Sequence, residues 1–415
     1  MAFVWKMQLN HLSLTNFRNF SRLDVEVPRG SILILGANAQ GKTSLLEAIY
    51  FLATFTSFHA SNDRELINFL STREPLAVAR IVADFRRNGG NHRLEVRVIQ
   101  ETNEFNGSPR LRKEVLLDRV KYKLGEVVGR FNAVLFLPQM LSIIEGSPDE
   151  RRRYLNLALA QVQQEYPDLL SHYNRALGQR NALLKQIGEY GGDRGQLEYW
   201  DDQLVTSGAR LIHARIQAVQ ELERIAARIH HELTRGGEVL RLDYQPAYDP
   251  LPHPPGQYSL PLDAPVYRAG LTMQDIRAGF IQQLAVKRDE EIARGVTTIG
   301  PHRDELRFLE SGVDLGTYGS RGQVRTALLA IKMAEVAWMR SKTGETPVLL
   351  LDEVLAELDT ERRADLLSRL AVIEQVLLTT TDLDLFTSEF VQQTTLWNVT
   401  AGRLDLDGTS TPGSH

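Results

Sequence analysis

The chain has 415 residues, 43% of them hydrophobic and 24% charged, which indicates a globular protein with about two or three compact units. It contains no cysteine, which excludes disulfides, thiolate zinc sites, iron–sulfur clusters and a cysteine nucleophile. With a formal net charge of −4, any nucleic-acid site must be a local basic patch. There is no signal-peptide core and no apolar run near the roughly 20 residues of a membrane span, so we expect a soluble, cytoplasmic protein without a membrane partner.

The first hundred residues predict the start of an α/β unit. Alternating or continuous apolar residues predict two strands between 8 and 27 around a turn at 18–21, then strands at 31–35, 76–85 and 93–100. From Lys42 apolar residues recur at helical spacing instead, so a strand, a glycine-rich loop and a helix follow one another.

The middle of the chain has a different character. Strand signals vanish over 149–236, and over 197–233 apolar residues recur at steps of mostly three and four, the seam of a long amphipathic helix. We interpret this segment as a helical arm inserted into the α/β unit, with helices of the main domain as the alternative. Seven prolines over 246–265 predict an irregular connection, α/β character returns over 299–406, and 408–415 predict a frayed end.

The strongest motif is a complete phosphate-binding loop, G-x-x-x-x-G-K-[ST], between the predicted strand and helix. In such a loop several backbone N–H groups face one phosphate, Lys42 neutralises the β- and γ-oxygens, and Thr43 offers its hydroxyl to Mg²⁺. An incidental glycine-rich turn is the alternative interpretation. The residues expected to bind ATP here are Gly36, Ala37, Asn38, Ala39, Gln40, Gly41, Lys42, Thr43 and Ser44.

An acidic pair follows the apolar run 348–351. Asp352 is the expected ligand of the metal, and Glu353 the expected base that positions the attacking water, with Lys42 as the second catalytic residue. A helix cap with an acidic neighbour is the alternative. Because ligands bind beyond the carboxyl ends of parallel strands, we expect the strands before the phosphate loop and before Asp352 to be neighbours in one parallel sheet.

The string Ser320-Arg321-Gly322-Gln323 stands at the start of a strongly predicted helix, 25 residues before the apolar run 348–351. Alone it could equally be a helix cap. Because it lies between the phosphate-binding loop and the acidic pair, it resembles the signature motif of ABC-type ATPases. That resemblance implies a mixed α/β head with flanking helices that forms a homodimer, in which Ser320, Gly322 and Gln323 reach the ATP of a second subunit.

Three lesser elements fit the same resemblance, although each could be an ordinary loop. Gln139 follows an apolar strand and resembles a Q-loop glutamine, which senses Mg²⁺ and the γ-phosphate. Asp359 resembles a D-loop aspartate, which would cross the dimer interface. Thr379, Thr380 and Thr381 stand where transport-type ABC proteins keep a switch histidine; a hydroxyl there can bond phosphate but carries no charge.

Three longer strings resemble the RecF family of bacterial DNA-repair proteins, which belongs to the ABC and SMC-like ATPases. They are residues 16–20, 146–155 and 300–306, and with the ATPase motifs the resemblance covers roughly 8–406. Within these strings Arg18 either contacts the nucleotide or pairs with a carboxylate. His302 and Arg303 have either a positioning or structural role, or a role in catalysis or DNA contact. Four residues, Gln139, Asn156, Arg321 and Val324, differ from those usual in the family. The contacts of the Q-loop and of the signature are therefore expected to differ in detail from those of the family.

The resemblance implies a domain order: the N-terminal part of the ATPase head at 1–148, the helical arm with the proline-rich connection at 149–295, and the C-terminal part of the head at 296–415. It also implies a slow, DNA-stimulated ATPase of recombinational repair and replication restart that uses ATP and Mg²⁺ as a dimerisation switch. Such a protein would bind duplex DNA and single-strand/double-strand gap junctions, and help to load recombinase with RecR and RecO type mediators. A transport-type ABC motor subunit, another SMC-like ATPase and an ABC-type nuclease are the alternatives.

Basic residues gather in one stretch of the N-terminal lobe. Their excess is either a patch that contacts DNA phosphates, with binding that falls steeply with salt, or a solvated hairpin face. These residues are Arg110, Arg112, Lys113, Arg119, Lys121, Lys123 and Arg130.

Overall fold

A computed structural model describes residues 7–60, 62–102, 109–248, 250, 268 and 270–406. It divides into two compact units: unit 1 comprises residues 1–139 and 335–415, and unit 2 comprises 140–334. Unit 2 is thus an insertion in the sequence of unit 1. Most of the proline-rich connection, and all of the end predicted to fray, lie outside the described residues.

The first sheet of unit 1 has six strands and is parallel except at one edge. Strands β12 and β13 are buried along their whole length, as continuous apolar strands in parallel sheets are. In spatial order the sheet consists of β15 (Arg403–Asp405), β14 (Thr395–Thr400), β3 (Gly30–Leu35), β13 (Gln375–Thr380), β12 (Val348–Asp352) and β8 (Ala133–Phe136).

This order corrects one expectation. The strand before the phosphate loop is β3 and the strand before Asp352 is β12, and they share one parallel sheet but are not neighbours. Strand β13, which is later in the chain, pairs with both of them. The prediction of neighbouring strands was wrong because apolar runs locate strands but do not encode their order in a sheet.

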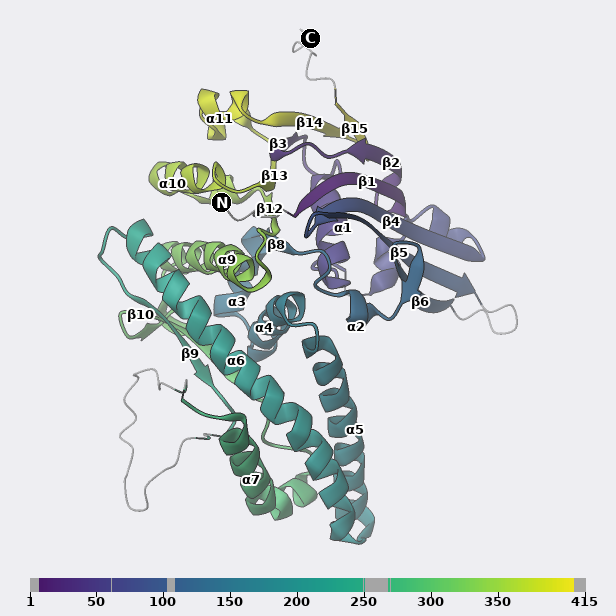
Figure 1. Cartoon of the computed structure of the whole chain (residues 1–415), viewed down its shortest axis with the longest axis vertical. Coiled ribbons are helices and arrows are strands. Elements are labelled where there is room, and N and C mark those ends of the chain that lie inside the picture. Colours follow the sequence, from purple (N-terminus) through teal and green to yellow (C-terminus); the bar gives the residue numbers. More distant parts are fainter. Residues whose placement is uncertain are drawn as a thin grey trace. The chain divides into compact units, whose positions relative to one another are not determined.

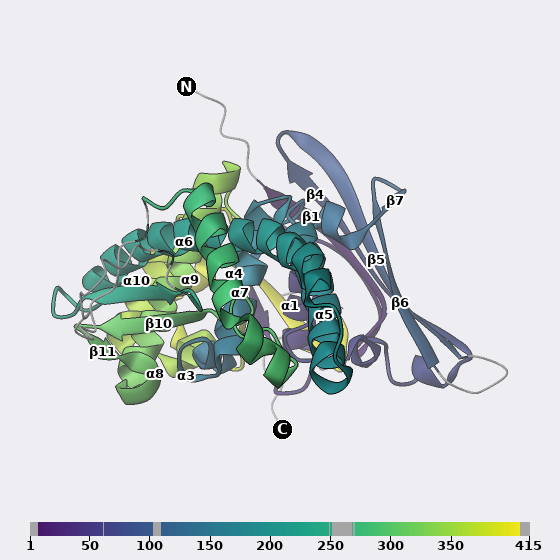
Figure 2. The same cartoon turned by 90° about the horizontal axis from the view of Figure 1, so that it is seen from below.

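The second sheet of unit 1 is antiparallel and has six strands (Figures 1 and 2). Helix α1 (Lys42–Thr54) packs against strands of both sheets, which explains why nearly all its side chains are buried. Gln375 also joins the sheets, because its amide donates to Leu9 O over 2.9 Å and accepts from Leu9 N over 2.8 Å. The strands in order are β2 (Phe20–Glu26), β1 (Gln8–Phe17), β4 (Leu76–Arg87), β5 (Gly90–Thr102), β6 (Pro109–Leu117) and β7 (Val120–Tyr122).

Unit 2 contains the predicted helical arm. Helix α6 (Leu197–Leu233) has the extent that its apolar seam predicts, and it packs against α5 (Tyr166–Tyr190) and α7 (Met273–Arg294) (Figure 1). Buried Arg180 of α5 joins all three helices, since its guanidinium lies 2.6 Å from Asp201 of α6 and 2.7 Å from Glu291 of α7. Among the described residues, no helix has both the length and the apolar composition needed to cross a bilayer.

The rest of unit 2 is a three-stranded antiparallel sheet with short helices and one long helix. In this division residues 296–334 group with the arm, because β10 pairs along the whole of β9. Their assignment to the ATPase head stays a prediction. Helix α9 begins in unit 2 and ends in unit 1. These elements are α3 (Ser142–Glu145), α4 (Pro148–Val162), β9 (Leu240–Gln245), β10 (Glu305–Glu310), β11 (Val313–Asp314), α8 (Leu315–Tyr318) and α9 (Arg321–Thr343).

Candidate functional site

The phosphate-loop sequence forms the connection between β3 and α1, the predicted strand–loop–helix unit. Two of its glycines are required by close contacts. A Cβ atom at Gly36 would lie 2.4 Å from the carbonyl oxygen of Val399, and one at Gly41, where φ is 121°, would lie 2.5 Å from the Asn19 side chain. The loop is therefore packed tightly against β14 and the turn between β1 and β2.

The two nucleotide motifs meet within unit 1. Buried Lys42 donates through Nζ to Gly36 O over 2.7 Å and to Ala37 O over 3.1 Å, and lies 3.0 Å from Glu353 Oε1. Thr43 Oγ1 donates to Asp352 Oδ2 over 2.8 Å, a contact between residues 309 positions apart in sequence. One ammonium, one hydroxyl and two carboxylates thus converge at the carboxyl ends of the parallel strands.

Thr379 contributes to this cluster in a way that the sequence analysis missed. Its hydroxyl donates to Asp352 Oδ1 over 2.6 Å and accepts from Glu353 N over 3.0 Å. The hydroxyl of Thr380 instead donates to Asp382 O over 2.8 Å, within its own loop. The sequence placed Thr379 at the switch position with a hydroxyl expected to bond phosphate, so its contacts with the acidic pair were not predicted.

The backbone at Glu353 is strained. Its φ of 52° lies in the left-handed region, which costs energy for a residue other than glycine and is often found at functional sites. The strained turn and the Thr379 hydrogen bond together fix the backbone from which the Glu353 carboxylate projects.

A pocket of about 850 Å³ lies over the phosphate loop within unit 1. Gly36, Ala37 and Gln40 belong to the loop but do not line the pocket, and Asp359 lies elsewhere in unit 1. The predicted residues that line the pocket are Arg18, Asn38, Ala39, Gly41, Lys42, Thr43, Ser44, Gln139, Asp352 and Glu353.

Arg18 has a carboxylate partner, the second of its two predicted roles, and it also lines the pocket. Its Nε and Nη2 atoms lie 2.7 and 2.8 Å from the carboxylate of Glu47 on α1, and Nη1 donates to Glu65 O over 3.0 Å. Because Glu47 is only 1% exposed, this two-pronged pair fixes the guanidinium firmly in the pocket wall.

The signature-like residues lie in unit 2 and form a helix cap. Ser320 Oγ accepts from Gln323 N over 3.3 Å, and Gln323 Oε1 accepts from Ser320 N over 2.9 Å, a reciprocal capping box at the start of α9. A Cβ atom at Gly322 would meet nothing closer than Ser320 Oγ, at 4.0 Å. This helix start is therefore open on the side of Gly322.

Asp359 is also a helix cap. It accepts from Arg362 N over 2.9 Å at the start of α10 (Thr360–Leu370). That backbone hydrogen bond, helped by the Arg362 side chain, lowers the pKa of Asp359.

The string at 300–306 makes buried contacts in unit 2. Asp304 is buried and accepts from Ala247 N over 2.8 Å, from Arg215 Nη1 over 3.1 Å and from the Tyr244 hydroxyl. His302 Nδ1 lies 2.6 Å from the Tyr173 hydroxyl, and burial lowers the pKa of His302 to about 4. These contacts join α5, α6 and β9, which supports the structural interpretation of His302, whereas Arg303 is exposed.

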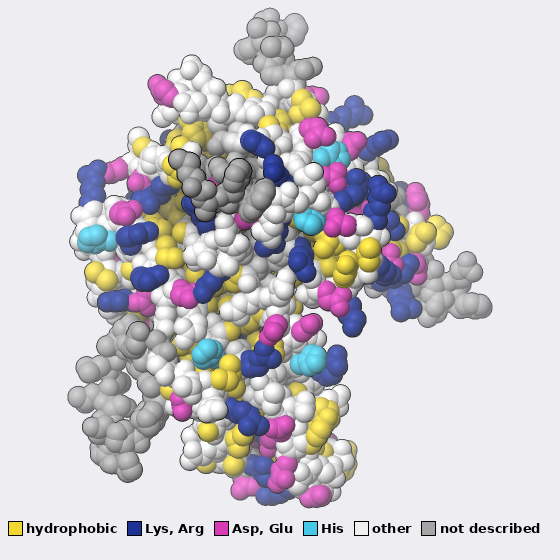
Figure 3. All heavy atoms as spheres, viewed as in Figure 1, with side chains coloured by type: hydrophobic (Ala, Val, Ile, Leu, Met, Phe, Trp, Pro, Cys, Tyr) yellow, Lys and Arg dark blue, Asp and Glu magenta, His cyan; other side chains and the backbone are white. Residues whose placement is uncertain are grey.

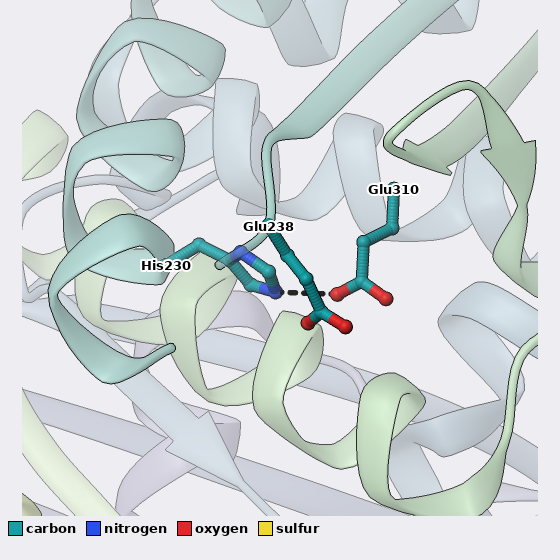
Figure 4. A group of neighbouring side chains, drawn as sticks. All are labelled: His230, Glu238 and Glu310. Atoms are coloured by element: carbon teal, nitrogen blue, oxygen red, sulfur yellow. Dashed lines mark ion pairs between the residues drawn. The ribbon is translucent and has the colours of Figure 1, made fainter. Parts of the chain in front are cut away.

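A second ionisable cluster in unit 2 was not predicted. His230 of α6, Glu238 and Glu310 of β10 converge so that their ligand atoms lie within 4.8 Å of one another (Figure 4). His230 Nε2 lies 2.8 Å from Glu310 Oε1, and Gln323 Nε2 lies 3.5 Å from Glu238 Oε1. The cluster thus joins the arm helix to the capped start of α9, a connection that sequence spacing could not reveal.

The basic stretch of unit 1 is partly neutralised. Arg112 and Lys121 both bond Glu114, and Lys113 lies 2.9 Å from Asp63. Within the part of the chain that the structure describes, Arg110, Arg119, Lys123 and Arg130 have no carboxylate partner. Figure 3 shows basic and acidic side chains interspersed over the surface of this region.

The family model for RecF/RecN/SMC N-terminal domains matches residues 8–401. The chain is 39% identical to the DNA replication and repair protein RecF of Roseiflexus castenholzii, over 96% of this chain and 99% of that one. It is also 39% identical to the RecF of Chloroflexus aurantiacus, with the same coverage.

Two solved structures resemble the fold. The recombination mediator protein RecF with ATP, in the RecFOR pathway, matches with a TM-score of 0.81 and 30% identity over 98% of this chain and 99% of that one. The Smc head domain from Pyrococcus furiosus matches with a TM-score of 0.50 and 16% identity over 96% of this chain and 95% of that one, a likeness of fold alone.

Proposed function

The chain belongs to the RecF/RecN/SMC family, and from this premise we propose that it is a RecF-type ATPase of DNA replication and repair. In this proposal the pocket of unit 1 binds ATP with Mg²⁺, and nucleotide binding closes a homodimer. The dimer binds single-strand/double-strand DNA junctions and helps to load recombinase with RecO and RecR type mediators, in line with the RecFOR pathway named for a similar structure.

The observation that carries the proposal is the meeting of Lys42 and Thr43 with Glu353 and Asp352 in one pocket. Lys42 is held by two carbonyls and a carboxylate, all oxygen acceptors, which is the environment that phosphate oxygens would also provide. Thr43 and Asp352 offer oxygen atoms side by side, the hard donors that Mg²⁺ prefers. Gln139 lines the same pocket and would complete the metal-sensing set. The residues present therefore fit a magnesium–triphosphate.

Each residue then has a defined task. Lys42 neutralises the negative charge that grows on the terminal phosphate, and backbone N–H groups of residues 36–44 hold the phosphates in place. Glu353 accepts a proton from the attacking water and orients it, while Asp352 holds the metal. When bound, Mg²⁺ supplies the charge that polarises the phosphate.

The open start of α9 supports the dimeric part of the proposal. Ser320, Gly322 and Gln323 lie at a helix N-terminus, where unsatisfied N–H groups favour an anion. We assign them to the γ-phosphate of ATP held by a second copy, with Asp359 at the same interface. Hydrolysis would then open the dimer, so that slow, DNA-stimulated turnover acts as a switch.

Size-exclusion chromatography with light scattering, with and without ATP, tests this function. Wild-type protein should form a dimer only with ATP and Mg²⁺, Glu353→Gln should trap the dimer, and Lys42→Arg should abolish it. Turnover should rise when gapped duplex DNA is added. A protein that stays monomeric in every state contradicts the switch, and turnover indifferent to DNA structure and salt favours a transport-type motor.

A further inference from the structure

Three side chains of unit 2 that can bind a metal converge beside the start of α9 (Figure 4). They are His230 in the last turn of α6, Glu238 just before β9, and Glu310 at the end of β10. Their ligand atoms lie within 4.8 Å of one another, and His230 Nε2 lies 2.8 Å from Glu310 Oε1. Two atoms bound to one Zn²⁺ at about 2.0–2.2 Å lie up to about 4.4 Å apart, so small side-chain rotations would bring all three to one ion.

The backbone that carries these side chains is fixed by hydrogen bonds. The pairing of β10 with β9 continues one step beyond the strands, because Ser311 N donates to Val239 O over 2.9 Å. This contact holds Glu238 beside the end of β10. At the end of α6, Thr234 donates through both its N and its Oγ1 to His230 O over 2.9 Å. The three ligands therefore project from supports that are already in place before an ion binds.

Burial and charge both favour a cation at this place. The side chain of His230 is 0% exposed and that of Glu310 is 2% exposed, whereas Glu238 is half-buried. Ionised groups are costly to take out of water unless they are paired or bind a metal. A dication beside a neutral imidazole balances the two carboxylates of this set, whereas one imidazolium balances only one of them. Half-buried Glu238 gives an ion access from solvent.

We propose that His230, Glu238 and Glu310 form a binding site for Zn²⁺ or a similar divalent transition-metal ion. An imidazole nitrogen with carboxylate oxygens suits such ions, whereas Mg²⁺ takes oxygen ligands and keeps several waters. Three protein ligands leave the fourth tetrahedral position to water. The site lies in unit 2 and shares no residue with the nucleotide pocket of unit 1, so it is separate from the Mg²⁺ proposed there.

A bound ion would cross-link unit 2. It would hold the end of α6 to β10 and to the segment before β9. Gln323 Nε2 lies 3.5 Å from Glu238 Oε1, so the same link reaches the capped start of α9. Because the unfolded chain lacks this arrangement of ligands, the ion binds the folded protein preferentially and should raise its unfolding temperature.

Titration calorimetry of the full-length protein with Zn²⁺, after treatment with a chelator and without nucleotide, tests the site. Wild type should bind one Zn²⁺ here, and Mg²⁺ should not displace it. His230→Gln and Glu238→Gln should weaken this binding by more than about 100-fold, since a lost ligand costs more than the 10- to 100-fold of a lost outer partner. Glu238→Gln is the milder variant because Glu238 is half-buried, and circular dichroism checks that both variants fold. Zn²⁺ should raise the unfolding temperature of wild type but not of Glu238→Gln.

Two controls locate the bound ion. His231→Gln removes the next histidine of the same helix, which is exposed and outside the cluster, and it should bind Zn²⁺ like wild type. Asp352→Asn removes a carboxylate of the nucleotide pocket and should also leave Zn²⁺ binding intact. Binding that survives in Glu238→Gln and His230→Gln, or that is lost in Asp352→Asn, would place the ion elsewhere. Wild type that binds no Zn²⁺ would leave the cluster an ion pair of His230 and Glu310. Either result overturns the proposal, and neither bears on ATP binding.

Discussion

At the scale of single residues, Thr379 positions both acidic side chains of the pocket. Its hydroxyl bonds Asp352 and the backbone of Glu353, so Thr379→Val removes both contacts at nearly constant volume. We expect ATP turnover and Mg²⁺ affinity to fall about 10- to 100-fold, as they do when the partners of metal ligands are removed. Steady-state turnover measured against Mg²⁺ concentration checks this. Thr380→Val, which loses only two hydrogen bonds to the backbone of Asp382 in its own loop, is the control, and equal effects in both variants would contradict the assignment.

His302 gives the protein a predicted response to acid. Burial lowers the pKa of His302 from 6.5 to about 4, so between these values the unfolded chain binds a proton that the folded protein does not. The free energy of unfolding should therefore fall as pH decreases through this window, by up to about 3 kcal/mol. Urea unfolding at several pH values should show a flatter dependence for His302→Gln. If NMR shows that the His302 imidazole titrates near pH 6.5 in the folded protein, this prediction is wrong.

At the scale of elements, the start of α9 combines a structural cap with a proposed phosphate contact. Ser320→Ala should lower the free energy of unfolding by about 0.5–2 kcal/mol, because the cap is lost. Ser320→Asp keeps a capping oxygen but places negative charge where a partner's phosphate would bind, so it should fold normally and fail to dimerise with ATP. Denaturant unfolding and light scattering measure the two effects. Thr387→Asp likewise replaces a capping hydroxyl by a carboxylate, at the start of α11 (Ser388–Gln392), and should leave dimerisation intact.

Elements with a strong local pattern could be predicted from the sequence, whereas their arrangement could not. The apolar seam predicted α6 from Leu197 to Leu233, and glycine spacing predicted the loop between β3 and α1. The position of β13 between β3 and β12 has no local signature, and so the hydrogen bonds of Thr379 could not be foreseen. Phe69 likewise has no local sequence signature that predicts its place in the lining of the pocket.

Over the whole chain, the length of the helical arm distinguishes this protein from ATPases with long coiled-coil arms. Helix α6 has 37 residues, about 55 Å at 1.5 Å per residue, and it packs with α5 and α7 inside unit 2. SMC-type coiled coils run for hundreds of residues, so the arm here is a short helical domain. Among the described residues, the cluster at His230 is the one His, Asp and Glu group that could hold a metal ion, and it includes none of the pocket's carboxylates.

The net charge of −4 means that DNA must be bound by a local patch, and ion pairing identifies which residues of the basic stretch could form it. Arg119 and Lys123 are exposed and have no carboxylate partner among the described residues, whereas Lys121 between them lies 2.7 Å from Glu114. If Arg119 and Lys123 each contact a phosphate, the double variant Arg119→Ala/Lys123→Ala should reduce the slope of log affinity against log salt by about 2.

Fluorescence anisotropy with gapped duplex DNA at several salt concentrations, in the presence of ATP, measures that slope. Lys121→Ala serves as the control because it removes a positive charge from β7, between the two positions, where the lysine is already paired with Glu114. It should change the slope by much less than 1. Equal slopes for wild type and the double variant would identify the stretch as a solvated hairpin face. DNA contact would then have to come from another surface of the ATP-closed dimer, whose formation the chromatography measures independently.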